Sequence, residues 1–330
     1  MQQSVPYFTV PDEKVRSLAI GSLAGTAIRI KKSLQVLIPR FDPLPEPGPD
    51  DWLAEHDEDG QAYDTYLSQH KNLVDEKKNV IYIQPLGKGI DLPFLETLKK
   101  FVHAYYYGLR VKVLRGIPME KFEVDNRISE ETGKIQYNAT QILKKLEPKL
   151  RSDAYCLIAI CMEDLYPRDE WNFVFGLASM KNRTGIFSFA RYHENWEKNE
   201  ENKLSIDDTK LIMRSLKVMI HEIGHMFGLR HCIYFNCIMN GSNTLEENDK
   251  KPIFMCPVCI RKLQHNIKFE FYDRLKALKN ASQEIGGEFE EAAKWYEEVA
   301  GEILRSYGPH YKPKSQKTDD GVQPKKNKKV

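Results

Sequence analysis

The eleven residues from His221 to His231 constrain the fold of this chain more than any other feature. They read HEIGHMFGLRH, an HExxHxxGxxH pattern. Residues four apart on a helix lie on one face, so His221 and His225 can direct their imidazoles to one point. Gly228 lacks a Cβ and lets the chain leave the helix through positive φ, which would bring His231 to the same point. The motif therefore predicts a buried helix, a glycine turn and a three-histidine zinc site.

Glu222 lies beside the first histidine, at the edge of the same helix face. There it can take a proton from a water that zinc activates without ligating the metal, so we interpret it as a general base. Three neutral histidines leave one position of a tetrahedral zinc open, which is typical of catalytic rather than structural sites. A bare HExxH often arises by chance, but this motif also has a glycine at its eighth position (Gly228) and a histidine at its eleventh (His231), and these two residues argue against a chance match. The apolar run before the motif predicts one helix over residues 209–229.

Four cysteines follow with the spacing of a second zinc site. Cys232 and Cys237 are separated by four residues, and Cys256 and Cys259 by two. Two short spacings are typical of four thiolates around a structural zinc. Adjacent side chains do not easily point the same way, so we expect His231 and Cys232 to serve different zinc ions. Disulfides or free buried cysteines are the alternative, and we favour zinc because no secretory signal is visible.

A methionine completes the pattern. Met239 lies eight residues after His231 and is followed by Asn240-Gly241, a strong turn signal. A lone methionine is usually core filler. A methionine in a tight turn beneath three zinc histidines is typical of metzincins, however, and we predict that Met239 forms the hydrophobic floor of the zinc site.

Taken together, these motifs resemble the archaemetzincins, metzincin-like zinc peptidases whose extra cysteines bind a second zinc. The chain looks like the animal archaemetzincin-2 branch over about residues 79–265. The resemblance implies that His221, His225 and His231 bind the catalytic zinc and that Glu222 is the general base. It also implies that the four cysteines bind the structural zinc. Further segments that carry it are YYGLRV (106–111), LYPR (165–168), WNFVFG (171–176), GIFSFARY (185–192), GSN (241–243) and CIRKLQ (259–264).

The hydrophobic pattern from residue 79 alternates between strands and helices, with a polar connection before the second helix. This alternation predicts an α/β (α+β) fold with a mixed, mostly parallel sheet backed by helices. In metzincins one antiparallel edge strand lies above the zinc cleft and pairs with the substrate, and residues 172–177 or 185–190 are our candidates. Cys156 and Cys161 lie in an apolar strand and are predicted to be core residues. Predicted strands are 80–83, 109–114, 155–162, 172–177 and 185–190, and predicted helices are 92–106, 140–150 and 209–229.

Composition suggests four regions. Residues 1–75 are rich in proline and acidic residues and are predicted to be a loosely ordered extension. The alternative is that Trp52 and Tyr66 pack on the core, and the resemblance leaves open that this region lies near the active site. Residues 76–265 would form the catalytic domain with both zinc sites. Residues 266–310 have helical periodicity, broken at Gly286-Gly287, and would form a C-terminal extension. Residues 311–330 are rich in lysine and are predicted to be a disordered tail.

The function predicted from these features is hydrolysis of peptide bonds in a peptide or protein substrate by a zinc-activated water, with two zinc ions per chain. Whether the enzyme is an aminopeptidase or an endopeptidase stays undecided. Tyr192 and His193 are weak candidates for a second oxyanion donor and are expected at the surface. The first alternative is a zinc-scaffolded peptide-binding protein with vestigial or gated activity, against which Glu222 argues, because a structural zinc needs no base. A nucleic-acid module is weaker, because acidic residues lie between the cysteine pairs.

Composition and hydropathy add few further constraints. The net charge of +2 indicates neither a nucleic-acid nor a membrane partner. No apolar run reaches the roughly 18 residues that a membrane span requires. We therefore expect an intracellular protein, cytoplasmic or nuclear, and nothing in the sequence indicates its oligomeric state.

Overall fold

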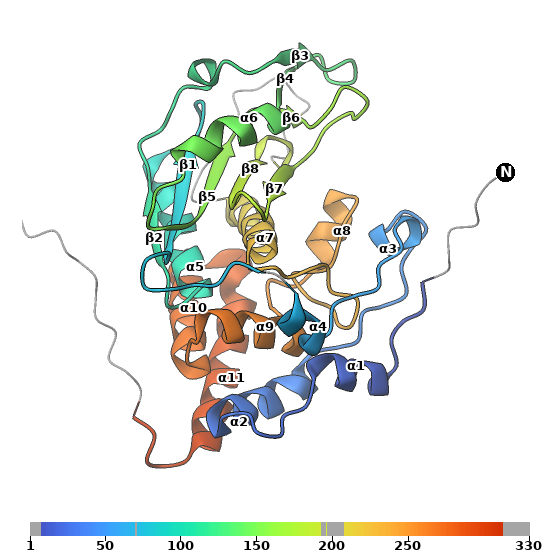
Figure 1. Cartoon of the computed structure of the whole chain (residues 1–330), viewed down its shortest axis with the longest axis vertical. Helices are drawn as coiled ribbons and strands as arrows, with labels where there is room; N and C mark the ends of the chain where they lie inside the picture. The colour runs from blue at the N-terminus through green and yellow to red at the C-terminus, as the bar shows by residue number, and fades with distance from the viewer. Residues whose placement is uncertain (1–7, 70, 193–195, 197–207, 313–330) are drawn as a thin grey trace, which may run out of the picture.

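The computed structural model describes residues 8–69, 71–192, 196 and 208–312 (Figure 1). Its centre is a five-stranded sheet of order β2-β1-β5-β8-β7, in which neighbouring strands are parallel except for the last pair. This mixed, mostly parallel sheet confirms the predicted fold class, and its strands overlap the five predicted ones. They are β1 (Val80–Pro85), β2 (Arg110–Val113), β5 (Ala154–Cys161), β7 (Gly176–Ser179) and β8 (Thr184–Ser188).

Helices cover both faces of this sheet. Every residue of β1 and β5 is buried, as expected for central strands of a parallel sheet. Alternate residues of β1 enter two different cores, because successive side chains of a strand point to opposite faces. Ile81 and Ile83 pack with residues of α5 (Leu92–Tyr105) and α7 (Thr209–Met226), whereas Val80 and Tyr82 pack with residues of α6 (Ala139–Leu146).

Strand β7 is the antiparallel edge strand. It pairs with β8, with Gly176 opposite Phe187. A Cβ at Gly176 would lie 2.2 Å from the Phe187 ring, so this close approach requires glycine. Of the two candidates for the edge strand, residues 172–177 overlap β7. The candidate 185–190 was wrong, because β8 is fully buried between β5 and β7.

A second sheet supports the segment that leads into β7. Arg127 and Gln136, on its strands β3 and β4, donate hydrogen bonds to the backbone carbonyl of Asn172 at 3.1 and 2.8 Å. The sequence predicts only a polar connection before α6, because these strands are too short to show a periodic pattern. The three strands, in the order β3-β4-β6, are β3 (Asn126–Ile128), β4 (Ile135–Asn138) and β6 (Asp164–Tyr166).

Helix α7 crosses beneath the sheet and carries the HExxH residues (Figure 1). The Asp208 carboxylate caps its N-terminus by accepting a hydrogen bond from the backbone N–H of Leu211 at 2.9 Å. The helix ends at Met226, three residues earlier than predicted. Gly228 follows with φ of +80°, which confirms the predicted glycine turn.

The N-terminal region contains helices and buried side chains, which contradicts the expectation of a loosely ordered extension. Leu34 and Tyr66 are fully buried, and the Tyr66 hydroxyl donates a hydrogen bond to the Phe227 carbonyl at 3.0 Å. Short helices pack against the helices at residues 257–267 and 290–307, and this burial orders the segment despite its proline and acidic content. The helices are α1 (Glu13–Ile20), α2 (Ile28–Leu37), α3 (Trp52–Glu55) and α4 (Tyr63–Ser68).

The C-terminal region is helical, as its periodicity predicts. Helix α10 (Phe271–Ile285) packs against α5, and α11 (Glu290–Tyr307) packs against α10 and α2. Gly286 ends α10 with φ of +72°, at the predicted break. The basic tail lies outside the described residues, apart from positions 311 and 312. No helix of the described part of the chain is long and apolar enough to cross a membrane.

Candidate metal and catalytic site

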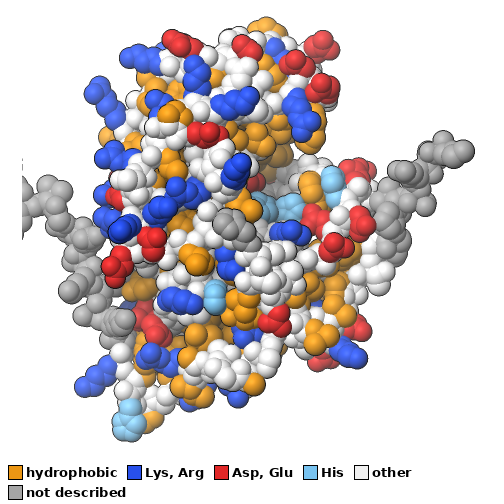
Figure 2. Space-filling model, viewed as in Figure 1, with side chains coloured by type: hydrophobic (Ala, Val, Ile, Leu, Met, Phe, Trp, Pro, Cys, Tyr) orange, Lys and Arg blue, Asp and Glu red, His pale blue; other side chains and the backbone are white. Residues whose placement is uncertain are grey.

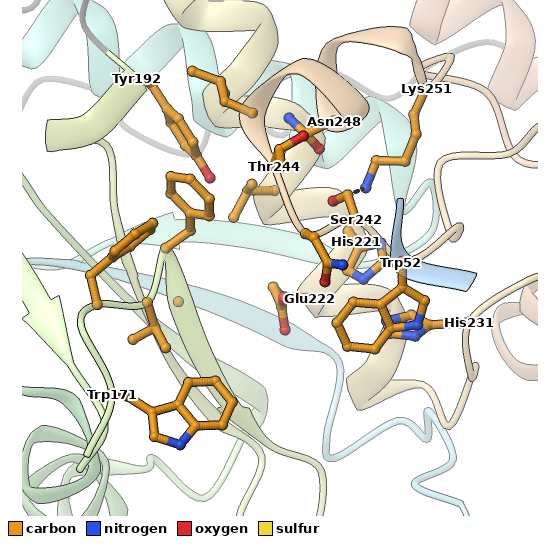
Figure 3. Close-up of a pocket in the computed structure, with 17 residues that line it drawn as sticks. Trp52, Trp171, Tyr192, His221, Glu222, His231, Ser242, Thr244, Asn248 and Lys251 are labelled. Carbon is orange, nitrogen blue, oxygen red and sulfur yellow. Dashed lines mark hydrogen bonds between the residues drawn. The ribbon is translucent and has the colours of Figure 1, made fainter. Parts of the chain in front are cut away.

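The three histidines of the motif converge on one point. Ring nitrogens of His221, His225 and His231 lie within 4.8 Å of one another. The Nε2 atoms of His221 and His225, which project from neighbouring turns of α7, are 3.0 Å apart. Figure 3 shows His221, His231 and Glu222 together at the wall of a cleft. The structure thus brings together all four residues that the sequence singles out for catalysis.

The other ring nitrogen of each histidine, Nδ1, already forms a hydrogen bond. Nδ1 of His221 donates to the backbone carbonyl of Ile238 at 2.9 Å, and Nδ1 of His225 to that of Leu229 at 2.7 Å. Nδ1 of His231 contacts a carboxylate oxygen at 2.5 Å. Because these partners accept hydrogen bonds, each Nδ1 carries the proton and each Nε2 presents a lone pair. Three lone pairs that converge repel one another unless a cation lies between them, so this donor set fits a zinc ion.

Burial keeps the rings of His221 and His225 neutral, as metal ligation requires. It lowers the pKa of His225 to about 4, and the nearby His231 lowers it further. Burial also holds the pKa of His221 well below its usual range, and the neighbouring His225 acts in the same direction. Neutral imidazoles are ready to bind a metal without first losing a proton.

Glu222 lines the same cleft. Burial raises the pKa of its carboxyl group to about 7, and the nearby His231 and Lys251 partly oppose the rise. Among the described residues, no hydrogen bond holds this carboxylate. It is therefore free to exchange a proton with a molecule in the cleft.

The turn that carries Met239 packs directly beneath α7. Met239 is fully buried, and a Cβ at Gly224 would lie 2.6 Å from its sulfur, so glycine allows this contact. The backbone N–H of Cys232 donates to the Met239 carbonyl at 2.8 Å. Asn240 fixes the turn, since its Oδ1 accepts from the Cys237 N–H and its Nδ2 donates to the Cys232 carbonyl. The structure therefore places Met239 in a turn against α7, at the level of Gly224 between His221 and His225.

The four cysteines form a second cluster. The sulfurs of Cys232, Cys237, Cys256 and Cys259 lie within 4.8 Å of one another, and all four side chains are buried. The last pair belongs to the N-terminus of α9 (Pro257–Ile267). None of them forms a disulfide. Burial opposes ionisation of Cys232, but hydrogen bonds from the other three thiols outweigh it and hold its pKa well below the usual range. This buried set of convergent sulfurs fits a tetrahedral zinc.

The remaining cysteines are core residues, as predicted. Cys156 and Cys161 are fully buried in β5 and belong to neither cluster. Burial raises the pKa of Cys161 to about 12, so its thiol stays protonated.

The N-terminal region reaches the histidine site through one side chain that the sequence analysis did not single out. Glu58 Oε1 is the atom that contacts Nδ1 of His231, 173 residues away in sequence, and it also accepts from Trp52 Nε1 at 2.6 Å. Burial opposes ionisation of Glu58, but its hydrogen bonds to His231 and Trp52 outweigh it and lower its pKa. The acidic stretch from residue 50 to 59 contains several carboxylates, and no local pattern distinguishes this one.

The cleft beside the histidines has a volume of about 370 Å³. Trp52 and Trp171 lie on opposite sides of its lower part in Figure 3, and Figure 2 shows the hollow from outside. Tyr192 is buried and lines the cleft, which corrects the expectation that it is a surface residue. His193, the other weak candidate for an oxyanion donor, lies outside the described residues.

Three histidines on and just beyond a helix, a glutamate beside the first and a methionine turn beneath define a zinc metallopeptidase of the metzincin type. The family model for peptidase family M54 matches residues 96–265. Archaemetzincin-2 of Homo sapiens is 38% identical over 281 residues, which cover 77% of this chain and 78% of that protein. The chain therefore belongs to peptidase family M54, the archaemetzincins.

Two further relatives show the range of similarity. Archaemetzincin-1 of Mus musculus is 29% identical over 261 residues, which cover 69% of this chain and 51% of that protein. The higher identity to archaemetzincin-2 confirms the predicted branch. The crystal structure of archaemetzincin from Methanopyrus kandleri is 28% identical with a TM-score of 0.45, and the match covers 59% of this chain and 98% of that one. The protein is a zinc metallopeptidase, and its family implies peptide or protein substrates.

Proposed function

We propose that the protein hydrolyses peptide bonds, with His221, His225 and His231 as ligands of the catalytic zinc and Glu222 as the general base. The observation that carries this proposal is the convergence of three ring nitrogens beside a carboxylate that has no other described partner. Zinc in this position would polarise the scissile carbonyl and lower the pKa of a water to about 7.

The side chain of Glu222 moves the proton. An ionised carboxylate takes a proton from the attacking water, and the same group later gives it to the leaving amine. The carboxylate lines the cleft and has no other described hydrogen-bond partner, so its oxygens are free to accept and release this proton. Trp52 and Trp171 give the cleft apolar walls that exclude water from a bound peptide.

We further propose that Cys232, Cys237, Cys256 and Cys259 hold a second, structural zinc, which gives two zinc ions per chain. Cys232 follows His231 directly, so an ion on the cysteines would fix the segment that positions the third histidine. Residues 76–265 would then be the catalytic domain with both sites. The described cysteines are all free thiols, which suits the intracellular, cytoplasmic or nuclear, location that we propose.

Zinc content per chain tests this function most directly. We expect two zinc ions in the wild-type protein and one in a His221→Ala/His225→Ala double variant, because the cysteine cluster keeps its own ion. Metal analysis of both proteins would be followed by peptide-library profiling of the wild type. One zinc in both proteins would show that the histidines hold none, and would favour a zinc-scaffolded peptide-binding protein with vestigial or gated activity.

A further inference from the structure

The three histidines are not held in the same way. His221 and His225 direct Nδ1 to backbone carbonyls, which are present whatever side chains surround them. His231 alone directs Nδ1 to a side chain, the Glu58 carboxylate, at 2.5 Å. The orientation of His231 therefore depends on a single carboxylate, and that carboxylate lies outside the span matched by the family model.

Trp52 fixes this carboxylate in turn. Its indole Nε1 donates to the same Glu58 oxygen at 2.6 Å, and its ring meets the His231 ring edge-on with centroids 4.9 Å apart. The ring occupies space that only glycine leaves free, because a Cβ at Gly241 would lie 2.3 Å from it. On the other side, the backbone N–H of Trp52 donates to the Glu247 carboxylate at 3.0 Å. Residues 52–58 are thus docked between the third histidine and the loop after Met239.

The contact is sheltered from solvent. The side chains of His231 and Glu58 are only 19% and 18% exposed, so water screens their hydrogen bond weakly. A carboxylate that accepts from Nδ1 fixes the tautomer of a ligating histidine, fixes the ring plane and makes Nε2 more basic. Loss of such a partner typically weakens metal binding about 10–100-fold.

We propose that Glu58 is a positioning residue of the histidine metal site, and that residues 52–58 and the bound ion hold each other in place. This proposal rests on the zinc site proposed above. If docking of the segment strengthens zinc binding, zinc must strengthen docking by the same factor, because coupling between two binding equilibria is reciprocal. The N-terminal region would then be part of the active site, and the docking of residues 52–58 would depend on whether the histidines hold metal.

The test measures zinc affinity and amide hydrogen exchange on the full chain. Glu58→Ala should weaken zinc binding at the histidines about 10–100-fold in a chelator competition, while zinc binding at the cysteines stays unchanged. In the wild-type protein, removal of zinc from the histidines should speed exchange in residues 52–58 by a similar factor. In Glu58→Ala the exchange of this segment should no longer respond to that zinc.

Asp57→Ala is the matched control, because Asp57 is an exposed carboxylate in the same segment. It should leave both zinc affinity and exchange unchanged. Trp52→Phe keeps the aromatic ring but removes the indole donor, and should weaken zinc binding less than Glu58→Ala does. Equal zinc affinity in Glu58→Ala and wild type would overturn the positioning role while leaving the zinc site intact. No zinc at the wild-type histidines would instead overturn the proposed function.

Discussion

Glu222→Gln should strongly slow peptide hydrolysis while the protein keeps both zinc ions. Glutamine has nearly the shape of glutamate but cannot take a proton from the attacking water. A general base contributes about 10²–10⁴-fold to the rate, so we expect kcat/KM to fall by about 10³-fold, which corresponds to about 4 kcal/mol. Zinc content should not change, because the three histidine rings converge without the help of this carboxylate. The measurement is steady-state cleavage of a peptide substrate together with metal analysis of the same sample.

Glu246→Gln provides the control, because Glu246 is exposed and, among the described residues, its ion pair is with Lys250 on the helix surface. It should leave both rate and metal content at the wild-type level. If Glu222→Gln lost one zinc, Glu222 would be a ligand rather than a base. If it kept the wild-type rate, another group would have to accept the proton.

Some of this site follows from local sequence because its geometry is local. His221 and His225 lie one helical turn apart, and Gly228 turns the chain so that His231 meets them. Such constraints act over a few residues and are visible in spacing alone. The same holds for the cysteine pairs and for the buried strands β1 and β5, whose continuous apolar runs are typical of parallel sheets.

The rest depends on long-range packing, which spacing does not encode. Glu58 meets His231 across 173 residues, and several neighbouring carboxylates have the same local pattern. Proline and acidic content suggested a loosely ordered lead-in, but burial of side chains such as Tyr66 against the zinc-motif region orders it. The strands of the small sheet escaped prediction because three or four residues are too few to show a period.

Loss of the cysteine cluster should have the largest effect on stability. Cys256→Ser removes one of four sulfurs around the proposed structural zinc, and we expect one zinc to be lost. Structural zinc sites contribute folding free energy directly, and loss of a metal is among the changes that destabilise proteins by more than about 4 kcal/mol. The free energy of unfolding, measured with and without a chelator, should therefore fall by at least that amount in the variant. A chelator that empties the cysteines should destabilise the wild-type protein in the same way.

Cys161→Ser is the appropriate control for this experiment, because Cys161 is equally buried but belongs to neither cluster. Its thiol already donates to the Glu163 carbonyl, a contact that a serine hydroxyl can also make, so the variant should keep both zinc ions.

Thiol labelling adds a second readout. Chelation should expose four reactive thiols in the wild-type protein, while burial and a pKa of about 12 keep Cys161 unreactive until the chain unfolds. Unchanged stability and zinc content in Cys256→Ser would rule out a structural role for the cysteines. Since Cys232 directly follows His231, loss of the structural zinc should also weaken zinc binding at the histidines, so that one substitution just before α9 reaches the catalytic site through the turn that joins the two clusters.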